Sequence, residues 1–151
     1  MNQSEISKSR LELSRTNLLN KPSLINAVSE VLSGDRRVLF AYLYGSFAEL
    51  GEGNDIDLAI YALEPAEPYG LSADLKIALH KKTGLPSETF DIRIVNDVAK
   101  IGDAFGLLYL KNVLDANRLL FDRDSVARAD FLERYGSRFK ECEAFMQELV
   151  G

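Results

Sequence analysis

The stretch Val38-Leu-Phe-Ala-Tyr-Leu-Tyr-Gly-Ser46, followed after eight residues by Asp55-Ile-Asp-Leu-Ala-Ile-Tyr61, decides the fold. The first seven residues are apolar on both faces and rich in strand-forming types, which predicts a buried central strand. The Gly-Ser pair ends this strand, and Ser46 can cap a short helix that reaches about Leu50. The second segment alternates in polarity, which predicts another strand with one face towards a core.

Helices and further strands alternate on both sides of this stretch. Helices are expected over residues 3–19, 22–33, 70–83, 97–114 and 124–149, and strands over residues 89–95 and 117–121. The last helix carries one apolar stripe that includes Phe131, Tyr135, Cys142 and Phe145. We therefore expect one α/β (α+β) domain over residues 1–151, with its core at about 24–122. A mixed sheet of about four strands flanked by helices is expected, with extra N- and C-terminal helices at about 3–19 and 124–149.

Composition limits the classes of protein that this chain can belong to. It has 18 Lys and Arg against 23 Asp and Glu, a net charge of −5, which is unfavourable for direct nucleic-acid binding. Its apolar runs are too short to cross a bilayer, and its polar N-terminal segment has no signal-peptide pattern. One cysteine, Cys142, excludes an intrachain disulfide. These features predict a cytoplasmic protein.

Asp55 and Asp57 are the most informative acidic pair. Residues two apart in a strand point to the same face, so these carboxylates repel each other unless a cation lies between them. Asp91 lies in the next alternating strand and joins the same face if the two strands are neighbours in compatible register. Three such carboxylates can hold one or two Mg²⁺ ions. An Asp-x-Asp also occurs by chance in half-exposed strands that have no function.

Gly45 and Ser46 form a second candidate feature. A strand that ends in Gly-Ser and turns into a helix presents free backbone N–H groups at the positive helix end, which suits a phosphate. The same pair can also be a simple turn with a helix cap. The combination with Asp55, Asp57 and Asp91 favours a nucleotide–metal site over either structural explanation alone.

These residues resemble the signature of the nucleotidyltransferase fold of the DNA polymerase β superfamily. The matching segments are Tyr44-Gly45-Ser46-Phe47-Ala48, Asn54-Asp55-Ile56-Asp57-Leu58 and Thr89–Val95, and the resemblance covers roughly residues 24–122. The small size is similar to that of the minimal nucleotidyltransferases, and the segment 107–124, including residues 119–124, resembles the tail of their MntA-type antitoxins. The interval between Gly-Ser and Asp-x-Asp, residues 47–54, is shorter than is usual in that antitoxin family.

The resemblance implies an enzyme and assigns roles to its residues. Gly45 and Ser46 would bind the β- and γ-phosphates of ATP, Asp55 and Asp57 would bind metal, and Asp91 would bind the catalytic Mg²⁺ and help deprotonate the acceptor. Family members transfer AMP from ATP to a tyrosine of a cognate HEPT-domain toxin, the expected protein partner. Two alternatives remain open: a small-molecule nucleotidyltransferase, and an antitoxin that acts by binding alone. The terminal helices could also form a homo-oligomer.

The positions of three further residues in the predicted strands and helix suggest what their side chains do. Arg93 shares the face of Asp91, where it could contact phosphate or pair with a nearby acid. Tyr44 is interpreted as packing within its strand rather than stacking on a base, and Cys142 as a core residue rather than a nucleophile.

Overall fold

The structure is a computed structural model that describes residues 21–45, 55–64 and 67–150. Its elements in chain order are α2 (Lys21–Ser33), β1 (Val38–Tyr44), β2 (Ile56–Ala62), α4 (Pro68–Thr83), η1 (Ser87–Thr89), β3 (Phe90–Ile94), α5 (Val98–Ile101), α6 (Ala104–Ala116), β4 (Leu119–Asp122) and α7 (Ser125–Val150). The expected helices at 3–19 and from Ser46 to Leu50 lie outside the described residues.

The strands form one mixed sheet in the order β3-β2-β1-β4. β1 is antiparallel to both of its neighbours, whereas β2 and β3 run parallel. This arrangement confirms the predicted mixed sheet of four strands and places β1 and β2 at its centre. The segment around residues 119–122, predicted as a strand, pairs with β1 at one edge.

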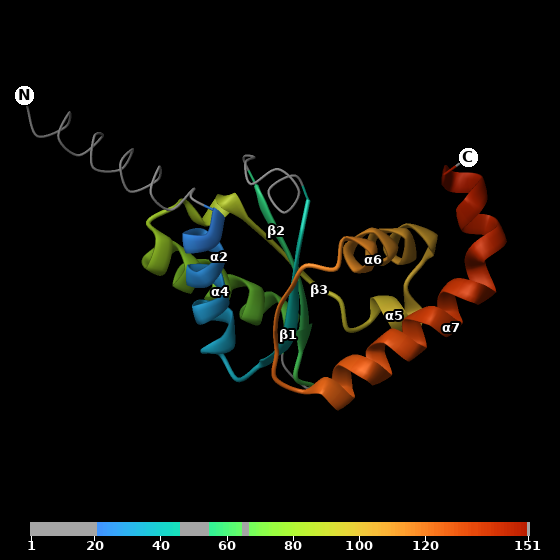
Figure 1. The fold of residues 1–151 in the computed structure, drawn as a ribbon, viewed down its shortest axis with the longest axis horizontal. Helices are drawn as coiled ribbons and strands as arrows, with labels where there is room; N and C mark the ends of the chain where they lie inside the picture. The colour runs from blue at the N-terminus through green and yellow to red at the C-terminus, as the bar shows by residue number, and fades with distance from the viewer. Residues whose placement is uncertain (1–20, 46–54, 65–66, 151) are drawn as a thin grey trace, which may run out of the picture.

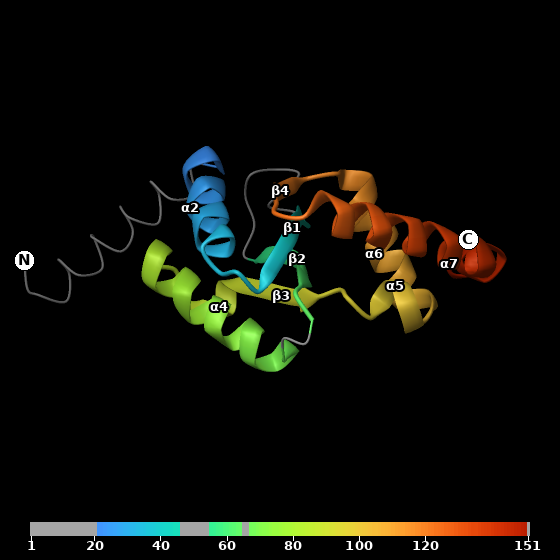
Figure 2. The same cartoon turned by 90° about the horizontal axis from the view of Figure 1, so that it is seen from below.

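Helices cover both faces of the sheet (Figures 1 and 2). α2 and α4 pack on one face through a core that includes Leu24, Leu58 and Leu75, all almost completely buried. α5, α6 and α7 pack on the other face, where Phe40, Leu110 and Phe131 belong to a second core. Because strand side chains alternate between faces, even-numbered residues of β2 enter the first core and odd-numbered ones face α6 and α7.

The segment 97–114, predicted as one helix, consists of two helices separated by Gly102 and Asp103. Gly102 has an extended ψ of 146°, and a Cβ there would lie 2.3 Å from the carbonyl oxygen of Val98. Asp103 then caps α6, because its side chain accepts a hydrogen bond from the N–H of Gly106 at 2.9 Å. The apolar periodicity continues across this break, so the pattern alone concealed it.

The N-terminal part of α7 packs against α5, α6 and the aromatic residues of the sheet, and the prediction that Cys142 is a core residue is wrong. Phe131 is buried, whereas Phe145 is 58% exposed and the partly exposed Cys142 belongs to neither core. The last clear anchor is Arg138, whose Nη2 donates to the carbonyl oxygen of Gly102 at 2.9 Å. A helix of 26 residues is about 39 Å long and extends beyond the sheet that it covers (Figure 1). In the described part of the chain, every helix is too short or too polar to cross a membrane.

Candidate functional site

Two aspartates meet where β2 and β3 begin. Asp57 is the second residue of β2 and Asp91 the second residue of β3, and the parallel register pairs them directly. Their neighbours Ile56 and Phe90 are buried in the first core, so both carboxylates project to the opposite face, towards α6. The predicted compatible register of these two strands is therefore present.

The environment of Asp57 favours its protonated form. Partial burial raises the pKa of its carboxyl to about 6, and the charge of Asp91, a side-chain hydrogen bond with Asp91 and the charge of Asp55 raise it too. The guanidinium of Arg93 acts in the opposite direction. Two carboxylates that share a proton in this way form a site that a cation can occupy in place of that proton.

Asp55 lies just before β2 and is exposed. It adds negative charge near Asp57, but the described residues contain no group of three or more His, Cys, Asp or Glu side chains arranged to hold a metal ion. The structure thus brings together two of the three predicted carboxylates. Two carboxylates fit Mg²⁺, which commonly binds to one or two protein carboxylates and completes its shell with water and substrate phosphates.

Gly45 brings the end of β1 against Asp57. Its φ is +90°, and a Cβ at this position would lie 2.1 Å from Oδ2 of Asp57. Only glycine fits both the conformation and the contact, so the close approach of the backbone to Asp57 requires a glycine at this position. The structure thus relates Gly45 to the acid pair, whereas Ser46 lies outside the described residues, and phosphate binding by both stays a prediction.

An arginine and two tyrosines border the acid pair on the α6 side. The guanidinium carbon of Arg93 lies 4.2 Å from the ring centroid of Tyr109, and Tyr44 meets that ring edge-on at 5.6 Å. Burial raises the pKa of Tyr109 to about 12, so its hydroxyl stays neutral beside the acids. Arg93 thus lies over an aromatic ring while its charge acts on Asp57, and its contact with phosphate stays a prediction.

Sequence reasoning missed Tyr109. It lies in the segment that was interpreted as one continuous apolar helix, and nothing in its immediate sequence marks it as a neighbour of Arg93 or Asp57. Tyr44 was interpreted as strand packing, and its half-buried ring packs against Tyr109 rather than within the strand alone.

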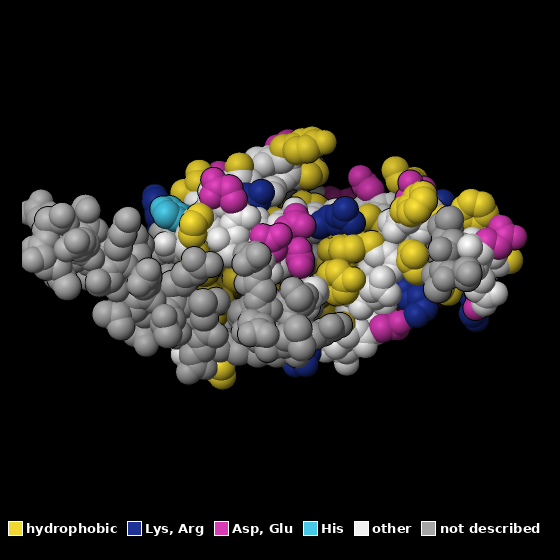
Figure 3. Space-filling view, turned by 90° about the horizontal axis from the view of Figure 1, so that it is seen from above, with side chains coloured by type: hydrophobic (Ala, Val, Ile, Leu, Met, Phe, Trp, Pro, Cys, Tyr) yellow, Lys and Arg dark blue, Asp and Glu magenta, His cyan; other side chains and the backbone are white. Residues whose placement is uncertain are grey.

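Acidic side chains gather beside a basic patch near the middle of the molecular face shown in Figure 3.

The mixed sheet, Gly45 after β1 and the acids at the start of β2 and β3 are the features on which the resemblance to the nucleotidyltransferases rests. Comparison with known proteins agrees, because the family model "Polymerase beta, Nucleotidyltransferase" matches residues 26–126, more than half of the chain. The chain therefore belongs to the polymerase β nucleotidyltransferase family, and the resemblance noted in the sequence is confirmed.

A solved structure of similar fold is a mutant of the toxin–antitoxin MntA–HpeT. The match has a TM-score of 0.55 and 13% sequence identity, and it covers 84% of this chain and 98% of the other. At this identity the match shows a shared fold. None of the curated proteins matches the sequence.

Proposed function

We propose that this protein is an adenylyltransferase antitoxin that transfers AMP from ATP to a tyrosine of a cognate HEPT-type toxin and thereby neutralises it. The observation that carries the proposal is the Asp57–Asp91 pair held against Gly45 in a chain of the polymerase β nucleotidyltransferase family. The similar fold in a toxin–antitoxin complex supports a protein partner of this kind.

The acid pair suits nucleotidyl transfer. Asp57 and Asp91 would hold Mg²⁺ together with the triphosphate, with Asp55 contributing charge or a further oxygen. Mg²⁺, when bound, neutralises phosphate charge and favours ionisation of the acceptor hydroxyl. Asp91 is exposed and would accept the proton of the tyrosine as its oxygen attacks the α-phosphorus. The bond from that phosphorus to pyrophosphate then breaks, and pyrophosphate leaves with its electrons.

The turn after β1 would orient the nucleotide. Gly45 presents its backbone close to Asp57, so a phosphate bound at Gly45 and Ser46 would lie beside the metal ligands. Catalysis would then rest on positioning and charge neutralisation more than on covalent chemistry. Arg93 lies over Tyr109 on the same side and would add positive charge near bound phosphates.

A second candidate is an antitoxin that masks its toxin by contact alone. The short interval between Gly-Ser and Asp-x-Asp, residues 47–54, favours it, because a shorter phosphate loop changes the fit of the nucleotide. The Asp57–Asp91 pair argues for catalysis instead, because the half-buried Asp57 held beside the like charge of the exposed Asp91 has no role in a purely contact-based partner.

The test is an incubation of the protein with its adjacent-gene partner, ATP and Mg²⁺, followed by intact mass measurement of both chains. The proposal predicts that the partner gains one or more AMP units on tyrosine. Asp57→Asn should abolish the gain, whereas the matched control Asp74→Asn changes an exposed acid of α4 and should leave it intact. A stable complex without any added mass would support the contact-based antitoxin. Modification of a small molecule in place of the partner would favour the remaining nucleotidyltransferase alternative.

A further inference from the structure

β3 leaves one of its edges open. β3 stands at the end of the sheet beside β2, and the N–H of Val95 donates to the carbonyl oxygen of Ile60 at 2.9 Å. The main-chain groups of successive strand residues point alternately to the two sides, so those of Ile92 and Ile94 point away from β2. In the described part of the chain, no turn or loop forms a backbone hydrogen bond with either residue.

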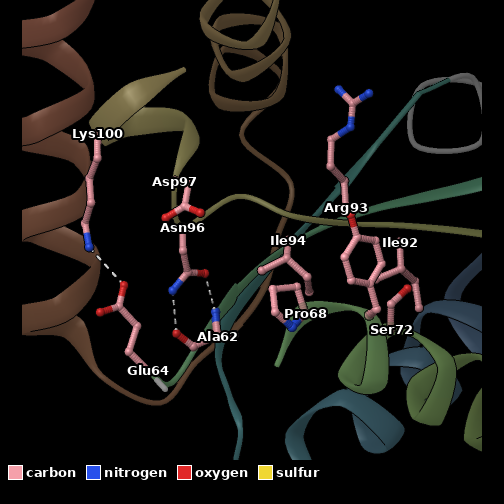
Figure 4. Close-up of a pocket in the computed structure, with 11 residues that line it drawn as sticks. Ala62, Glu64, Pro68, Ser72, Ile92, Arg93, Ile94, Asn96, Asp97 and Lys100 are labelled. Carbon is pink, nitrogen blue, oxygen red and sulfur yellow. Dashed lines mark hydrogen bonds and ion pairs between the residues drawn. The ribbon is translucent and has the colours of Figure 1, made fainter. Parts of the chain in front are cut away.

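A groove of about 790 Å³ runs along this edge (Figure 4). Its walls come from the first turns of α4, including Pro68, Tyr69 and Ser72, and from Ile92 and Ile94 of β3. The two isoleucines are partly buried against the first core, and Tyr69 is 87% exposed. The groove therefore offers apolar contacts beside main-chain donors and acceptors that no residue in the described ranges pairs with.

The far end of the groove is held in place by three interactions between two pairs of residues, all drawn in Figure 4. The side chain of Asn96 accepts from the N–H of Ala62 at 2.8 Å and donates to the carbonyl oxygen of Ala62 at 2.7 Å. Lys100 pairs with Glu64 at 2.9 Å. The side chain of Asn96 thus continues the hydrogen bonding of β2 beyond the end of β3. The C-terminal end of β3 is therefore held in place, so its open edge can pair with another strand.

We propose that this edge binds an extended segment of the protein acceptor by β-strand addition, an inference that rests on the proposed function. Main-chain groups spaced as in a strand are recognised by another strand, which is why the occupant is an extended peptide. The groove is continuous with the candidate site, because Arg93 lines it and Asp91 lies two residues earlier on the same strand. A peptide bound there delivers its hydroxyl to the acid pair.

Arg93 has an alternative explanation as a charge that blocks unwanted pairing at a sheet edge. Its position argues against that role, because its guanidinium lies 4.2 Å from the ring centroid of Tyr109, on α6. In Figure 4 Arg93 extends away from Ile92 and Ile94, which lie towards Pro68 and Ser72. The guanidinium of Arg93 thus lies on the side of the acid pair, and it leaves the main-chain groups at the open edge of β3 accessible.

The alternation of β3 also predicts the pattern of the bound peptide. Residues opposite Ile92 and Ile94 face α4 and should be apolar, whereas the residue between them lies opposite Arg93 and shares the face of Asp91. Diagonal neighbours on paired strands lie about 7–8 Å apart, a span within reach of a tyrosine side chain. The expected acceptor is therefore a tyrosine with an apolar residue on each side.

The test compares Ile94→Pro with Ile94→Ala in the full chain. Both variants lose the same side chain, but only proline loses the outward N–H, and proline is tolerated on the open side of an edge strand. AMP transfer is measured against the concentration of the adjacent-gene partner. Ile94→Pro should raise the KM for the partner about tenfold over Ile94→Ala, with ATP binding unchanged in both. Equal KM values would overturn the proposal.

A second measurement does not depend on folding of the proline variant. Amide hydrogen exchange at Ile92 and Ile94 of the wild-type protein should slow when the partner is added, because both N–H groups become hydrogen-bonded. Unchanged exchange at these two amides in the complex contradicts strand addition. A wild-type protein that modifies no partner refutes the proposed function separately, and amide exchange in the complex then decides whether the edge is used.

Discussion

A Cβ at Gly45 would lie 2.1 Å from Oδ2 of Asp57, so the backbone at Gly45 and the carboxylate of β2 occupy adjoining space with no room for a side chain. Gly45 directly follows β1, whose last residue, Tyr44, lies opposite Asp57 in the antiparallel pair of β1 and β2. This contact fixes the backbone at Gly45 relative to the acid pair. It makes Gly45 the residue whose replacement should disturb the site most directly.

Gly45→Ala should therefore destabilise the protein and displace Asp57. The left-handed φ of +90° costs an L-residue about 1–2 kcal/mol, and the collision with the carboxylate adds to this. Urea unfolding measures the loss. The matched control is Gly136→Ala in α7, where a Cβ would meet nothing within 4 Å and helix propensity predicts a neutral or slightly stabilising change. Equal changes in the free energy of unfolding for the two substitutions would contradict a requirement for glycine at position 45.

The pKa of Asp57 predicts how stability depends on pH without metal. Its carboxyl titrates near pH 6 in the folded state, above the ordinary value of 3.8, so the folded state holds more protons between these values. Stability should fall as pH rises from about 4 to 6, because the unfolded state is then favoured by ionisation. In Asp57→Asn this contribution should vanish, and above pH 6 the variant should be the more stable protein. Unfolding temperatures in metal-free buffer at several pH values measure the difference. A wild-type curve parallel to that of the variant would contradict the shift.

Binding of Mg²⁺ to the ionised Asp57–Asp91 pair should offset the loss of stability that ionisation of Asp57 causes. At about ten times its Kd the ion should add about 1.4 kcal/mol to the free energy of unfolding. The gain should be larger at pH 8 than at pH 5, since protons compete for Asp57 below its pKa of about 6. Thermal unfolding with and without Mg²⁺ measures it. Asp74→Asn should respond like the wild type, and an undiminished response in Asp57→Asn would place the ion elsewhere.

Tyr109→Leu should lower the free energy of unfolding by removing aromatic contacts beside the acid pair. The substitution removes the ring under Arg93 and the edge-on contact with Tyr44, which together stabilise by about 1–2 kcal/mol. Tyr109→Phe retains both ring contacts and should change stability little. Urea unfolding of the two variants separates the role of the ring from that of the hydroxyl. A large loss in Tyr109→Phe would instead assign the role to the hydroxyl.

Two phenylalanines of α7 test how far the helix belongs to the core. Phe131 is buried against Phe40 and Tyr61, and Phe131→Ala should cost about 3–5 kcal/mol. Phe145 is 58% exposed, and Phe145→Ala should change stability by less than about 0.5 kcal/mol. Denaturant unfolding of both variants gives the comparison. Similar losses would mean that the end of the helix is packed as tightly as its beginning.

Local patterns predicted most elements of the described fold. β1 has the predicted bounds, Val38–Tyr44, because a strand buried on both faces leaves an uninterrupted apolar run. The break at Gly102 escaped prediction because apolar spacing persists through it and a single glycine is tolerated in a helix. The stripe of α7 gave no sign of where the sheet beneath it ends, since that limit depends on the rest of the fold.

Local sequence patterns also predicted part of the candidate site, but not the contacts that depend on long-range packing. The residue spacing placed Asp57 and Asp91 on strand faces, and the parallel register brings them together. Tyr109 comes from a helix far along the chain, and no local pattern connects it to Arg93. The contact of Gly45 with Asp57 likewise depends on strand pairing, although the glycine itself was a candidate from its position at the strand end.

The most direct test of nucleotidyl transfer uses two preparations of ATP, labelled at the α-phosphorus or at the γ-phosphorus, each incubated with the protein, its adjacent-gene partner and Mg²⁺. Attack at the α-phosphorus predicts that the partner becomes labelled from the first preparation and stays unlabelled with the second. Asp57→Asn should abolish the labelling. Label that arrives from the γ-phosphorus, or a partner that stays unlabelled with both, would contradict the account.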